Sequence, residues 1–362
     1  MKRLFISVAL LLAAASLFAQ NGLSFTEANE LTIVGKVFPD TPNPYERMDF
    51  NKYGGWTAKD VNLLEMSSGV IVSFKTDATT ICVKPEFKEI SQAMTSGFAA
   101  RGFDLYIKKS GEWLWAGAVS YGLDKARENG KVRTLVEKMA EGEKECILYL
   151  PTYSKEVSVK IGVPEGSRIE KGDVPFRHRI CLHGSSFMHG ASTGRSGQTV
   201  PGYLTRMTGM QFCSLGVSGD CRLEPQFANA LKDAEVDAFV FDGFSNGNAG
   251  TVEKNLFKFI EDLQAAHPGK PMIFMSTIWR ERRNFNTRED KAEGEKIAMA
   301  DSLMRIAVKK YKDVYYVTTS NATSAQHDTT IDGVHPGSWG YYMWAESVRK
   351  PILKILKKYG IK

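Results

Sequence analysis

The sequence predicts two domains of different class, an all-β sandwich followed by an α/β/α domain with a five-stranded parallel sheet. From about residue 20 to residue 171, short strand-like segments are separated by polar turns. After residue 175, strand-like and helical segments alternate. The first pattern is typical of antiparallel sheets, and the second of parallel strands joined by helical crossovers. A chain of 362 residues is also long enough to bury two hydrophobic cores.

The first 19 residues have the composition of a secretory signal peptide. Lys2 and Arg3 precede an apolar stretch from Leu4 to Phe18, and the small residue Ala19 stands at the expected cleavage site. This stretch is too short for a good membrane anchor, and no later segment approaches about 18 uninterrupted apolar residues. We therefore expect export to the periplasm or the extracellular space, with no stable membrane insertion.

The charges and cysteines exclude several other classes of protein. Basic and acidic residues, 47 and 41 in number, are interspersed, and no nucleic-acid-binding motif is present, so we expect no nucleic-acid partner. The five cysteines form no CxxC pair, which argues against a disulfide framework and a zinc site. We expect neither a metal nor a cofactor. A disulfide between Cys213 and Cys221 remains open, as does the oligomeric state.

The first domain is predicted to span residues 20–173 and to be a jelly-roll-like sandwich. Its strand-like segments are rich in Val, Ile, Tyr and Trp. They lie at 70–75, 80–84, 103–108, 113–118, 146–150 and 157–161. Short strands with polar turns between them favour a sandwich over βαβ units.

The second domain is predicted to span residues 174–362 and to have a flavodoxin-like α/β/α fold. Its strand-like segments begin at Ile180, Phe212, Ala238, Met272 and Val314. Helical segments lie near 199–208, 224–234, 252–266, 289–311 and 339–358. Five strands with intervening helices predict a parallel sheet that is covered on both faces, with right-handed crossovers.

The first candidate for chemistry is Ser186, which follows the apolar segment 180–182 and Gly184. A short apolar segment that stops at Gly and Ser predicts a buried strand ending in a tight turn. The serine then lies at the carboxyl edge of the sheet, where open α/β sheets carry their active sites. Ser beside Gly is also ordinary turn composition, so the assignment depends on partners.

Three further polar turns contain such partners. Asp332 stands three residues before His335 in a loop that also contains Gly and Pro. Gly219 and Asn246 each lie in a turn that follows a strand-like segment. Four polar, glycine-bearing turns of this kind are hard to explain as unrelated, so we interpret them as one active site.

These four turns resemble the sequence blocks of the SGNH hydrolase superfamily, also called GDSL-type esterases. The resemblance implies that Ser186 is the nucleophile and that His335 and Asp332 complete a catalytic triad. Gly219 matches the second block and Asn246 the third. A flavodoxin-like hydrolase domain and ester substrates are what this resemblance implies for fold and activity.

Two other segments resemble one bacterial subfamily. The segment 190–197 is similar to the one that follows the nucleophile there, and Gly102 to Tyr106 resembles the GxDLY-type signature of a β-sandwich that precedes the hydrolase. The resemblance thus covers nearly the whole chain after the signal peptide. Ser185 departs from the family, in which Asp commonly stands before the nucleophile, but that residue is not part of the triad.

Ester hydrolysis gives each of these residues a physical role. A serine hydroxyl is a poor nucleophile at neutral pH, so Ser186 needs His335 as a base, while Asp332 holds the ring by its other nitrogen. The backbone N–H groups of Ser186 and Gly219 and the side-chain amide of Asn246 form the expected oxyanion hole.

Three residues have alternative interpretations. Asn246 is also well placed to cap the helix that begins near Thr251. Arg195 either binds a polar group of the substrate at the mouth of the site or is an ordinary surface arginine. Trp279 either forms a wall on which a sugar stacks or packs within its own loop.

The sequence therefore predicts a secreted serine esterase that acts on a small-molecule or glycan ester. Because relatives with an added β-sandwich often act on acetylated carbohydrate, the resemblance implies removal of acetyl or other short acyl groups from carbohydrate esters. One alternative is a lipid or lysophospholipid esterase, which a long apolar acyl groove would favour. Another is a non-catalytic glycan-binding protein, although such a protein has no physical need for the complete set of site residues.

Overall fold

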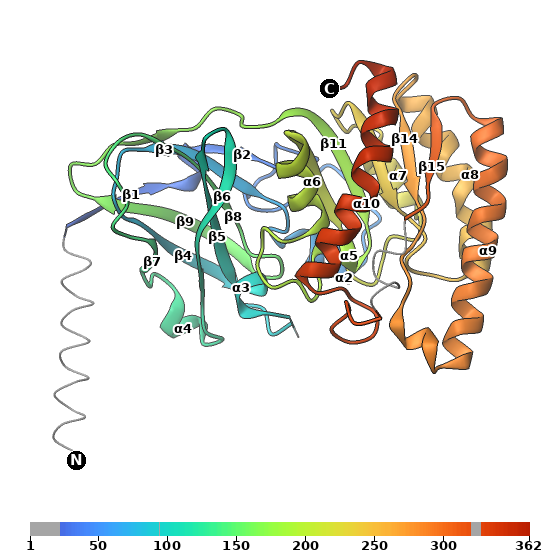
Figure 1. Cartoon of the computed structure of the whole chain (residues 1–362), viewed down its shortest axis with the longest axis horizontal. Coiled ribbons are helices and arrows are strands. Elements are labelled where there is room, and N and C mark those ends of the chain that lie inside the picture. Colours follow the sequence, from blue (N-terminus) through green and yellow to red (C-terminus); the bar gives the residue numbers. More distant parts are fainter. Residues whose placement is uncertain (1–21, 94, 320–326) are drawn as a thin grey trace, which may run out of the picture.

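The computed structural model describes residues 22–93, 95–319 and 327–362, which form two domains lying side by side (Figure 1). A β-rich N-terminal domain is followed by an α/β domain with a five-stranded parallel sheet, so the predicted fold class is confirmed. The predicted signal peptide lies outside the described residues. None of the helices in the described part of the chain is long and apolar enough to cross a bilayer.

The N-terminal domain consists of two antiparallel sheets packed face to face. Its strands are β1 (Leu23–Glu27), β2 (Thr32–Val34), β3 (Ile71–Thr76), β4 (Ile81–Glu89), β5 (Gly102–Lys109), β6 (Glu112–Ser120), β7 (Arg133–Val136), β8 (Lys144–Tyr149), β9 (Lys155–Pro164) and β10 (Ile169–Lys171). One sheet has the order β1-β9-β4-β7 and the other β10-β3-β8-β5-β6, with β2 paired to β3. Inward side chains of both sheets, such as Phe74, Val83, Leu105 and Ile161, share one core.

Short helices connect some of these strands. They are η1 (Ala28–Glu30), α2 (Ala58–Leu64), α3 (Gly97–Ala100) and α4 (Lys125–Glu128). The sequence did not predict them, because helices of one or two turns show too little periodicity to be recognised.

The segment between β2 and β3 leaves the sandwich and covers part of the second domain. Apolar residues of this segment, including Leu64 and Met66, belong to the core of the α/β domain. The guanidinium of Arg47 is fully buried and donates to three backbone carbonyl oxygens, one of them that of Gly216 in the second domain, at 2.8 Å. Because a buried charge is costly unless it is hydrogen-bonded, these contacts fix the segment in place.

The second domain contains every predicted strand and helix, with ends that differ by a few residues. The strands are β11 (Arg177–Gly184), β12 (Met210–Gly216), β13 (Ala238–Asp242), β14 (Met272–Met275) and β15 (Val314–Val317). The helices are α5 (Ser186–His189), α6 (Val200–Thr208), α7 (Pro225–Leu231), α8 (Ala249–Ala266), η2 (Glu281–Asn284), α9 (Thr287–Lys310), α10 (Ser338–Leu356) and η3 (Lys357–Tyr359). All five strands are parallel, in the order β12-β11-β13-β14-β15.

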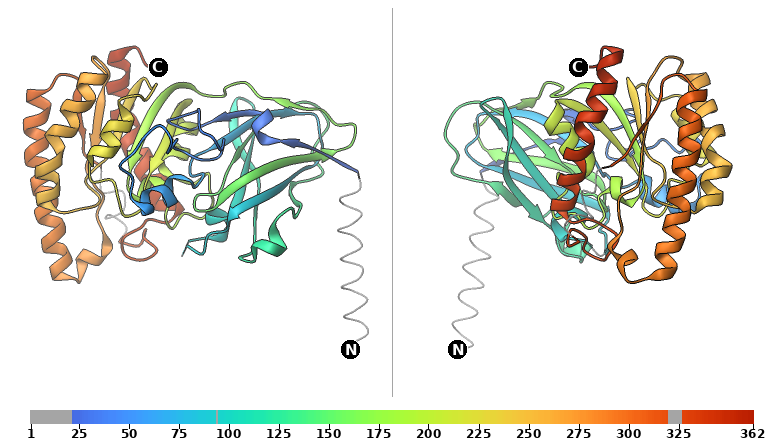
Figure 2. Two further views of the ribbon diagram at one scale, coloured as in Figure 1. Left: turned by 180° about the vertical axis from the view of Figure 1, so that it is seen from behind. Right: turned by 45° about the vertical axis from the view of Figure 1, so that its right-hand side comes forward.

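Helices cover both faces of this sheet (Figure 2). Phe239 and Phe241 of β13 pack in one core with α7, α8 and α9, whereas Val240 packs in a second core with α6 and α10. The two-residue period of a strand produces this alternation. Because the strands run in one direction, their carboxyl ends meet at one edge of the sheet, where the predicted site turns begin.

Candidate active site

Ser186 is the first residue of α5, immediately after the turn that ends β11. Ser185 is the N-cap residue, and its Oγ accepts a hydrogen bond from the backbone N–H of Phe187 at 3.2 Å. A side chain at position 184 is excluded, because a Cβ on Gly184 would lie 2.3 Å from Cγ of Met188. The strand end, the glycine and the cap together hold Ser186 at the carboxyl edge of the sheet.

The side chains of Ser186, His335 and Asp332 form a continuous hydrogen-bonded chain. Ser186 Oγ lies 2.8 Å from Nε2 of His335, and Nδ1 of the same ring lies 2.8 Å from Oδ2 of Asp332. Oδ1 of Asp332 accepts the backbone N–H groups of Val334 and His335 at 2.9 and 2.7 Å. The spacing of three residues therefore lets one loop hold both the ring and the carboxylate that orients it.

These contacts also keep Asp332 charged. Partial burial alone would raise the pKa of Asp332, but hydrogen bonds from the backbone and ring of His335 and from the backbone of Val334 outweigh burial and lower this pKa to about 2. The ionised carboxylate accepts the Nδ1 proton, which leaves Nε2 free to accept a proton from Ser186. This arrangement can perform base-activated nucleophilic attack.

Two other histidines near the nucleophile turn, His183 and His189, are fully buried. Nδ1 of His183 lies 2.8 Å from the carbonyl oxygen of Leu215, and Nε2 of His189 lies 2.7 Å from that of Thr152. Burial lowers the pKa of His183 to about 4 and that of His189 well below its ordinary value. Both rings are therefore neutral at pH 7 and contribute packing.

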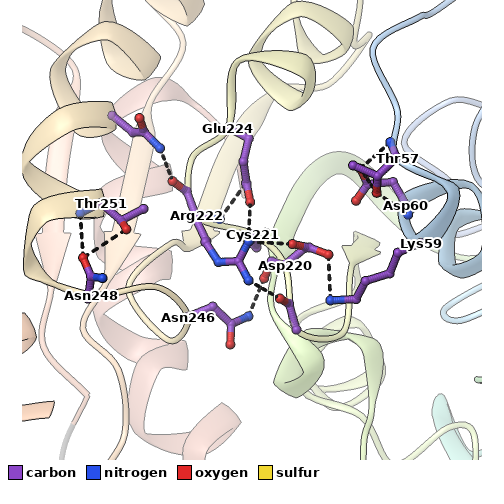
Figure 3. Close-up of polar contacts among 12 residues, drawn as sticks. Thr57, Lys59, Asp60, Asp220, Cys221, Arg222, Glu224, Asn246, Asn248 and Thr251 are labelled. Atoms are coloured by element: carbon purple, nitrogen blue, oxygen red, sulfur yellow. Dashed lines mark hydrogen bonds and ion pairs between the residues drawn. The ribbon is translucent and has the colours of Figure 1, made fainter. Parts of the chain in front are cut away.

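The turns that carry Gly219 and Asn246 border the same cavity as Ser186. Gly219 has a φ of 72°, in the left-handed region that favours glycine. Nδ2 of Asn246 donates to the backbone carbonyl oxygen of Asp220 (Figure 3). The N-cap of α8 is Asn248, whose Oδ1 accepts a backbone N–H of that helix at 3.0 Å, so Asn246 does not cap the helix.

Asp242, the last residue of β13, joins the nucleophile turn to the turn of Asn246. Its Oδ2 accepts the hydroxyl of Ser185 at 2.6 Å and the backbone N–H of the same residue at 3.2 Å, while Oδ1 accepts the hydroxyl of Ser245. Burial raises the pKa of Asp242, and the hydrogen bonds from both serines oppose that shift. This carboxyl group thus fixes two of the four predicted turns relative to each other.

Ser186 and His335 open onto a cavity of about 490 Å³ that both domains form. Its lining consists of Ala93, Thr95, Tyr153, Ser186, Ala191, Ser192, Ser218, Gly219, Asn246, Arg280, Asp332, Val334 and His335. The first three of these residues belong to the N-terminal domain. Apart from the hydrogen-bonded Asp and His, Arg280 is the only lining residue in the described part of the chain that carries a charged side chain.

Tyr153 and Arg280 are the lining residues that sequence reasoning missed most clearly. The hydroxyl of Tyr153 lies 2.7 Å from Oγ of Ser218, and its ring stacks on His189 with the ring centres 4.3 Å apart. No local pattern marks Tyr153, because its contacts depend on how the two domains dock. Arg280 directly follows Trp279, so the prediction was one residue away from it.

Two family models match the sequence. Residues 177–354 match the GDSL-like Lipase/Acylhydrolase family, and residues 23–169 match the family described as N-terminus of Esterase_SGNH_hydro-type. A protein from Bacteroides ovatus, described as a GDSL-like lipase, has 32% sequence identity and a TM-score of 0.88, with 92% of this chain and 98% of that chain covered. The chain belongs to the GDSL-like lipase/acylhydrolase family. The resemblance inferred from the four turns and from the GxDLY-type segment is thereby confirmed.

More distant structures share the fold of this chain. A salicylyl-acyltransferase from a tetracycline biosynthetic pathway has 20% identity and a TM-score of 0.72, with 94% of this chain and 99% of that chain covered. A family two carbohydrate esterase from Cellvibrio japonicus has 11% identity and a TM-score of 0.57, with 92% and 98% covered. The comparison with curated proteins gives no match.

Arg195 and Trp279, which were predicted to bind substrate, are not among the described residues that line the cavity. NH1 of Arg195 lies 3.0 Å from Oδ1 of Asp104, within the GxDLY-type segment. Nε1 of Trp279 donates to Oδ1 of Asn284 at 3.2 Å, and the guanidinium of Arg283 lies 4.0 Å from the centre of its ring. Arg195 therefore joins the two domains, and Trp279 contacts its own loop.

The thiols of Cys213 and Cys221 are buried and free. Sγ of Cys213 lies 3.8 Å from the carbonyl oxygen of Gln211, and Sγ of Cys221 lies 3.6 Å from that of Asp242. Of the two possibilities that the sequence left open, the structure therefore contains the free thiols.

Proposed function

We propose that this protein is an exported serine esterase that removes acetyl or other short acyl groups from carbohydrate esters. The observation that carries the proposal is the hydrogen-bonded chain from Ser186 through His335 to Asp332, which opens onto the cavity between the domains. A hydroxyl, an imidazole and an ionised carboxylate in this order can activate the serine and return its proton to the leaving group.

The reaction proceeds in two halves. Ser186 Oγ attacks the ester carbonyl carbon while Nε2 of His335 takes the hydroxyl proton. The C–O bond to the alcohol then breaks, His335 gives its proton to that alcohol, and the acyl group remains on the serine. A water molecule attacks this acyl-serine with His335 again as the base, which releases the carboxylic acid and restores Ser186.

Both halves pass through a tetrahedral intermediate with a negatively charged oxygen. The backbone N–H groups of Ser186 and Gly219 and the side-chain amide of Asn246 are the donors for this oxygen in our proposal. Removing one such donor typically lowers kcat by about 10² to 10³. The backbone of Gly219 has a φ of 72°, which favours glycine, and this conformation sets the direction of its N–H group.

The lining of the cavity supports a short acyl group and a polar leaving alcohol. Among the described lining residues, the aliphatic ones are Ala93, Ala191 and Val334, whose small side chains offer little apolar surface to a long acyl chain. A second hollow of about 580 Å³ shares Thr95 and Ser192 with the first. Hydroxyl side chains at positions 95, 96, 192, 193 and 338 line it and can both donate to and accept from the hydroxyl groups of a sugar.

Two further observations support an extracellular carbohydrate ester. The predicted signal peptide supports export. The family two carbohydrate esterase from Cellvibrio japonicus shares the two-domain fold over 92% of this chain. At 11% identity this likeness supports the fold of such an enzyme, and the choice of substrate depends on the experiment below.

The decisive experiment measures hydrolysis of nitrophenyl acetate, butyrate and octanoate, together with release of acetate from an acetylated oligosaccharide. Wild-type protein is compared with Ser186→Ala and His335→Ala, and with Ser302→Ala on the exposed face of α9 as a control. We expect both site variants to lose several orders of magnitude in kcat, with about 10³- to 10⁴-fold residual catalysis over water.

The pattern of activity separates the alternatives. Preference for acetate, together with acetate release from the oligosaccharide, supports the proposal. Preference for octanoate indicates a lipid esterase. Absence of serine-dependent turnover on all substrates, with retained folding, contradicts an esterase and favours a glycan-binding protein.

A further inference from the structure

The loop from Ser218 to Leu223, which follows β12, has an unusual backbone. Gly219, Cys221 and Leu223 all have positive φ values, of 72°, 71° and 58°. Residues with a Cβ adopt this left-handed region only at an energetic cost, so Cys221 and Leu223 keep it only where surrounding contacts impose it. The contacts that impose this shape therefore control the position of the Gly219 backbone.

The side chain of Asp220 is the centre of these contacts (Figure 3). Its Oδ1 lies 2.9 Å from NH1 of Arg222, and its Oδ2 lies 2.8 Å from Nζ of Lys59. NH2 of Arg222 also donates to the carbonyl oxygen of Gly219 at 2.8 Å. Two cations thus hold one carboxylate, and one of them also holds the backbone of Gly219.

The main chain of Asp220 connects the loop to Asn246. Its carbonyl oxygen accepts a hydrogen bond from Nδ2 of Asn246, so the loop also sets the orientation of this side-chain amide (Figure 3). A primary amide has two N–H groups, which leaves the second one available for another acceptor. Two of the three proposed donors lie outside the nucleophile turn, on Gly219 and Asn246. Gly219 directly precedes Asp220 in the chain, and Asn246 is hydrogen-bonded to the Asp220 carbonyl, so both depend on the position of Asp220.

Lys59 reaches this loop from the N-terminal domain. It lies in the first turn of α2, whose start is fixed by a capping box between Thr57 and Asp60 (Figure 3). A Cβ built on Gly219 would lie 2.7 Å from Nζ of Lys59, so the ammonium group packs directly over the glycine. A cation in the first turn of a helix is unfavourable by itself, and the contact with Asp220 offsets this.

We propose that Lys59 is a positioning residue for the oxyanion hole, acting through Asp220 on Gly219 and Asn246. This inference rests on the proposed esterase function. Through Lys59, the N-terminal domain contributes to turnover as well as to the walls of the cavity. Lys59 touches no reacting atom, and its effect comes from holding two donors at the distance that the charged intermediate requires.

Such a role has a specific kinetic signature. Donors of the oxyanion hole are aimed at the charge that develops in the transition state, so misplacing them lowers kcat more than it raises KM. A displacement of about 1 Å can cost about 100-fold in rate. A lysine that only joined the domains would change stability and leave kcat per folded molecule unchanged.

The test compares Lys59→Met with Lys52→Met in the full mature chain. Lys52 is a matched control, because its Nζ lies 3.1 Å from Asp233 in an ion pair that also joins the segment before β3 to the α/β domain. Its side chain is 57% exposed, against 51% for Lys59. We expect kcat of Lys59→Met for nitrophenyl acetate to fall by about 10- to 100-fold while KM stays within about twofold, and Lys52→Met to match the wild type.

A boronic acid inhibitor provides a second readout, because its tetrahedral adduct with the serine places a charged oxygen in the oxyanion hole. We expect its affinity to fall in parallel with kcat in Lys59→Met and to recover in Lys59→Arg, which restores a cation. In a double-mutant cycle, Lys59→Met should add little to the loss caused by Asp220→Asn.

The outcomes separate this inference from the proposed function. If the wild type shows no Ser186-dependent turnover, the esterase function is wrong and the inference fails with it. If the wild type is active and Lys59→Met retains its kcat and boronate affinity, or loses no more than Lys52→Met does, the esterase function stands and the positioning role is overturned. Thermal unfolding of each variant shows that the rates refer to folded protein.

Discussion

The carboxylate of Asp104 in the N-terminal domain and the guanidinium of Arg195 in the α/β domain form an ion pair, with 3.0 Å between Oδ1 and NH1. Asp104 has no solvent exposure, and its oxygens also accept hydrogen bonds from the indole of Trp115 at 3.0 Å and from the backbone N–H of Gly197 at 3.1 Å. Burial raises the pKa of Asp104, and the charge of Arg195 opposes this. The pair thus fastens the segment after the nucleophile turn to the β-sandwich.

We expect Arg195→Ala to destabilise the protein by about 3 kcal/mol, because it removes the ion-pair partner of the buried Asp104 carboxylate and leaves only the charge of Arg206 to oppose its burial. Urea unfolding measures this effect. The matched control is Arg127→Ala, which removes an exposed ion pair with Asp124 and should cost less than about 1 kcal/mol.

We also expect KM of folded Arg195→Ala to stay within about twofold of the wild type, because Arg195 is not among the described residues that line the cavity. A large increase in KM with unchanged stability would instead assign Arg195 to substrate binding.

Ser185 stands where members of the family commonly have aspartate, and in this chain it is a hydrogen-bond partner of the buried Asp242. The buried carboxyl of Asp242 accepts both the hydroxyl and the backbone N–H of Ser185. In Ser185→Asp, two carboxyl groups would share a site closed to solvent, and one of them would have to stay neutral. We expect this variant to be destabilised by up to about 4 kcal/mol at pH 7, the cost of holding an ordinary aspartate protonated there.

The double variant Ser185→Asp/Asp242→Asn again has one carboxyl group and one neutral partner at this site. It should therefore recover much of the stability that Ser185→Asp loses. Urea unfolding of the single and double variants at pH 7 and pH 5 measures the effect. The deficit of the single variant should shrink at the lower pH, because protonation then costs less. An equal deficit in both variants at both pH values would mean that size rather than charge selects serine here.

Asp332→Asn tests the orienting role of the carboxylate. The amide oxygen can still accept the backbone N–H groups of Val334 and His335, so the loop should keep its shape. The amide NH₂ would then face Nδ1 and favour the wrong tautomer of the ring, and we expect kcat to fall by about 10⁴. Asp328→Asn, at an exposed position just before this loop, is the control and should match the wild type.

The titration of Asp332 has its own expected signature. Because its pKa is lowered to about 2 in the folded protein, its stabilising contribution is complete at neutral pH and is lost only as the pH falls toward 2. Loss of activity between pH 7 and pH 4 should therefore come from another group. A pH profile of kcat that is identical in shape for wild type and Asp332→Asn, with equal kcat, would contradict a role for this carboxylate.

The arrangement of Ser186, Gly219 and Asn246 could be predicted because parallel strands bring their carboxyl ends to one edge. Each of these residues follows a strand that its apolar sequence makes recognisable, and the sheet then places the turns together. Asp332 and His335 were predictable for a different reason, since three residues in one loop suffice to bring a carboxylate to a ring. Local sequence thus determines most of this site.

Contacts across the domains could not be predicted in the same way. Tyr153 and Lys59 approach the site only because the two domains dock in one orientation, and docking depends on complementary surfaces that leave no periodic pattern in either segment. The alternation of side chains along a strand does not fix their direction beyond the end of that strand. The sequence therefore led to Trp279, whereas its neighbour Arg280 lines the cavity. The contacts of Tyr153 and Lys59 with the site therefore depend on long-range packing.

Glu156 of β9 is a buried acid that the proposed mechanism does not use. The hydroxyl of Ser67 donates to its Oε2, while its buried Oε1 has no hydrogen-bond partner in the described part of the chain. Burial raises the pKa of Glu156 to about 8, and the hydrogen bonds from Ser67 and from its own backbone only partly oppose this. Folded protein therefore holds this group protonated at neutral pH, whereas the unfolded chain releases the proton.

The pKa of Glu156 is higher in the folded protein than in the unfolded chain. At a pH between these two pKa values the unfolded chain binds fewer protons than the folded protein does, so the free energy of unfolding falls as the pH rises. We expect the wild type to lose about 1.4 kcal/mol per pH unit relative to Glu156→Gln in this window, which ends near the folded pKa of about 8. Urea unfolding of both proteins at pH 5.5, 6.5 and 7.5 measures the difference, with Glu165→Gln at an exposed turn as the control. Equal dependence of the unfolding free energy on pH in the wild type and Glu156→Gln would mean that Glu156 is ionised in the folded protein. A water molecule or a cation would then contact its Oε1.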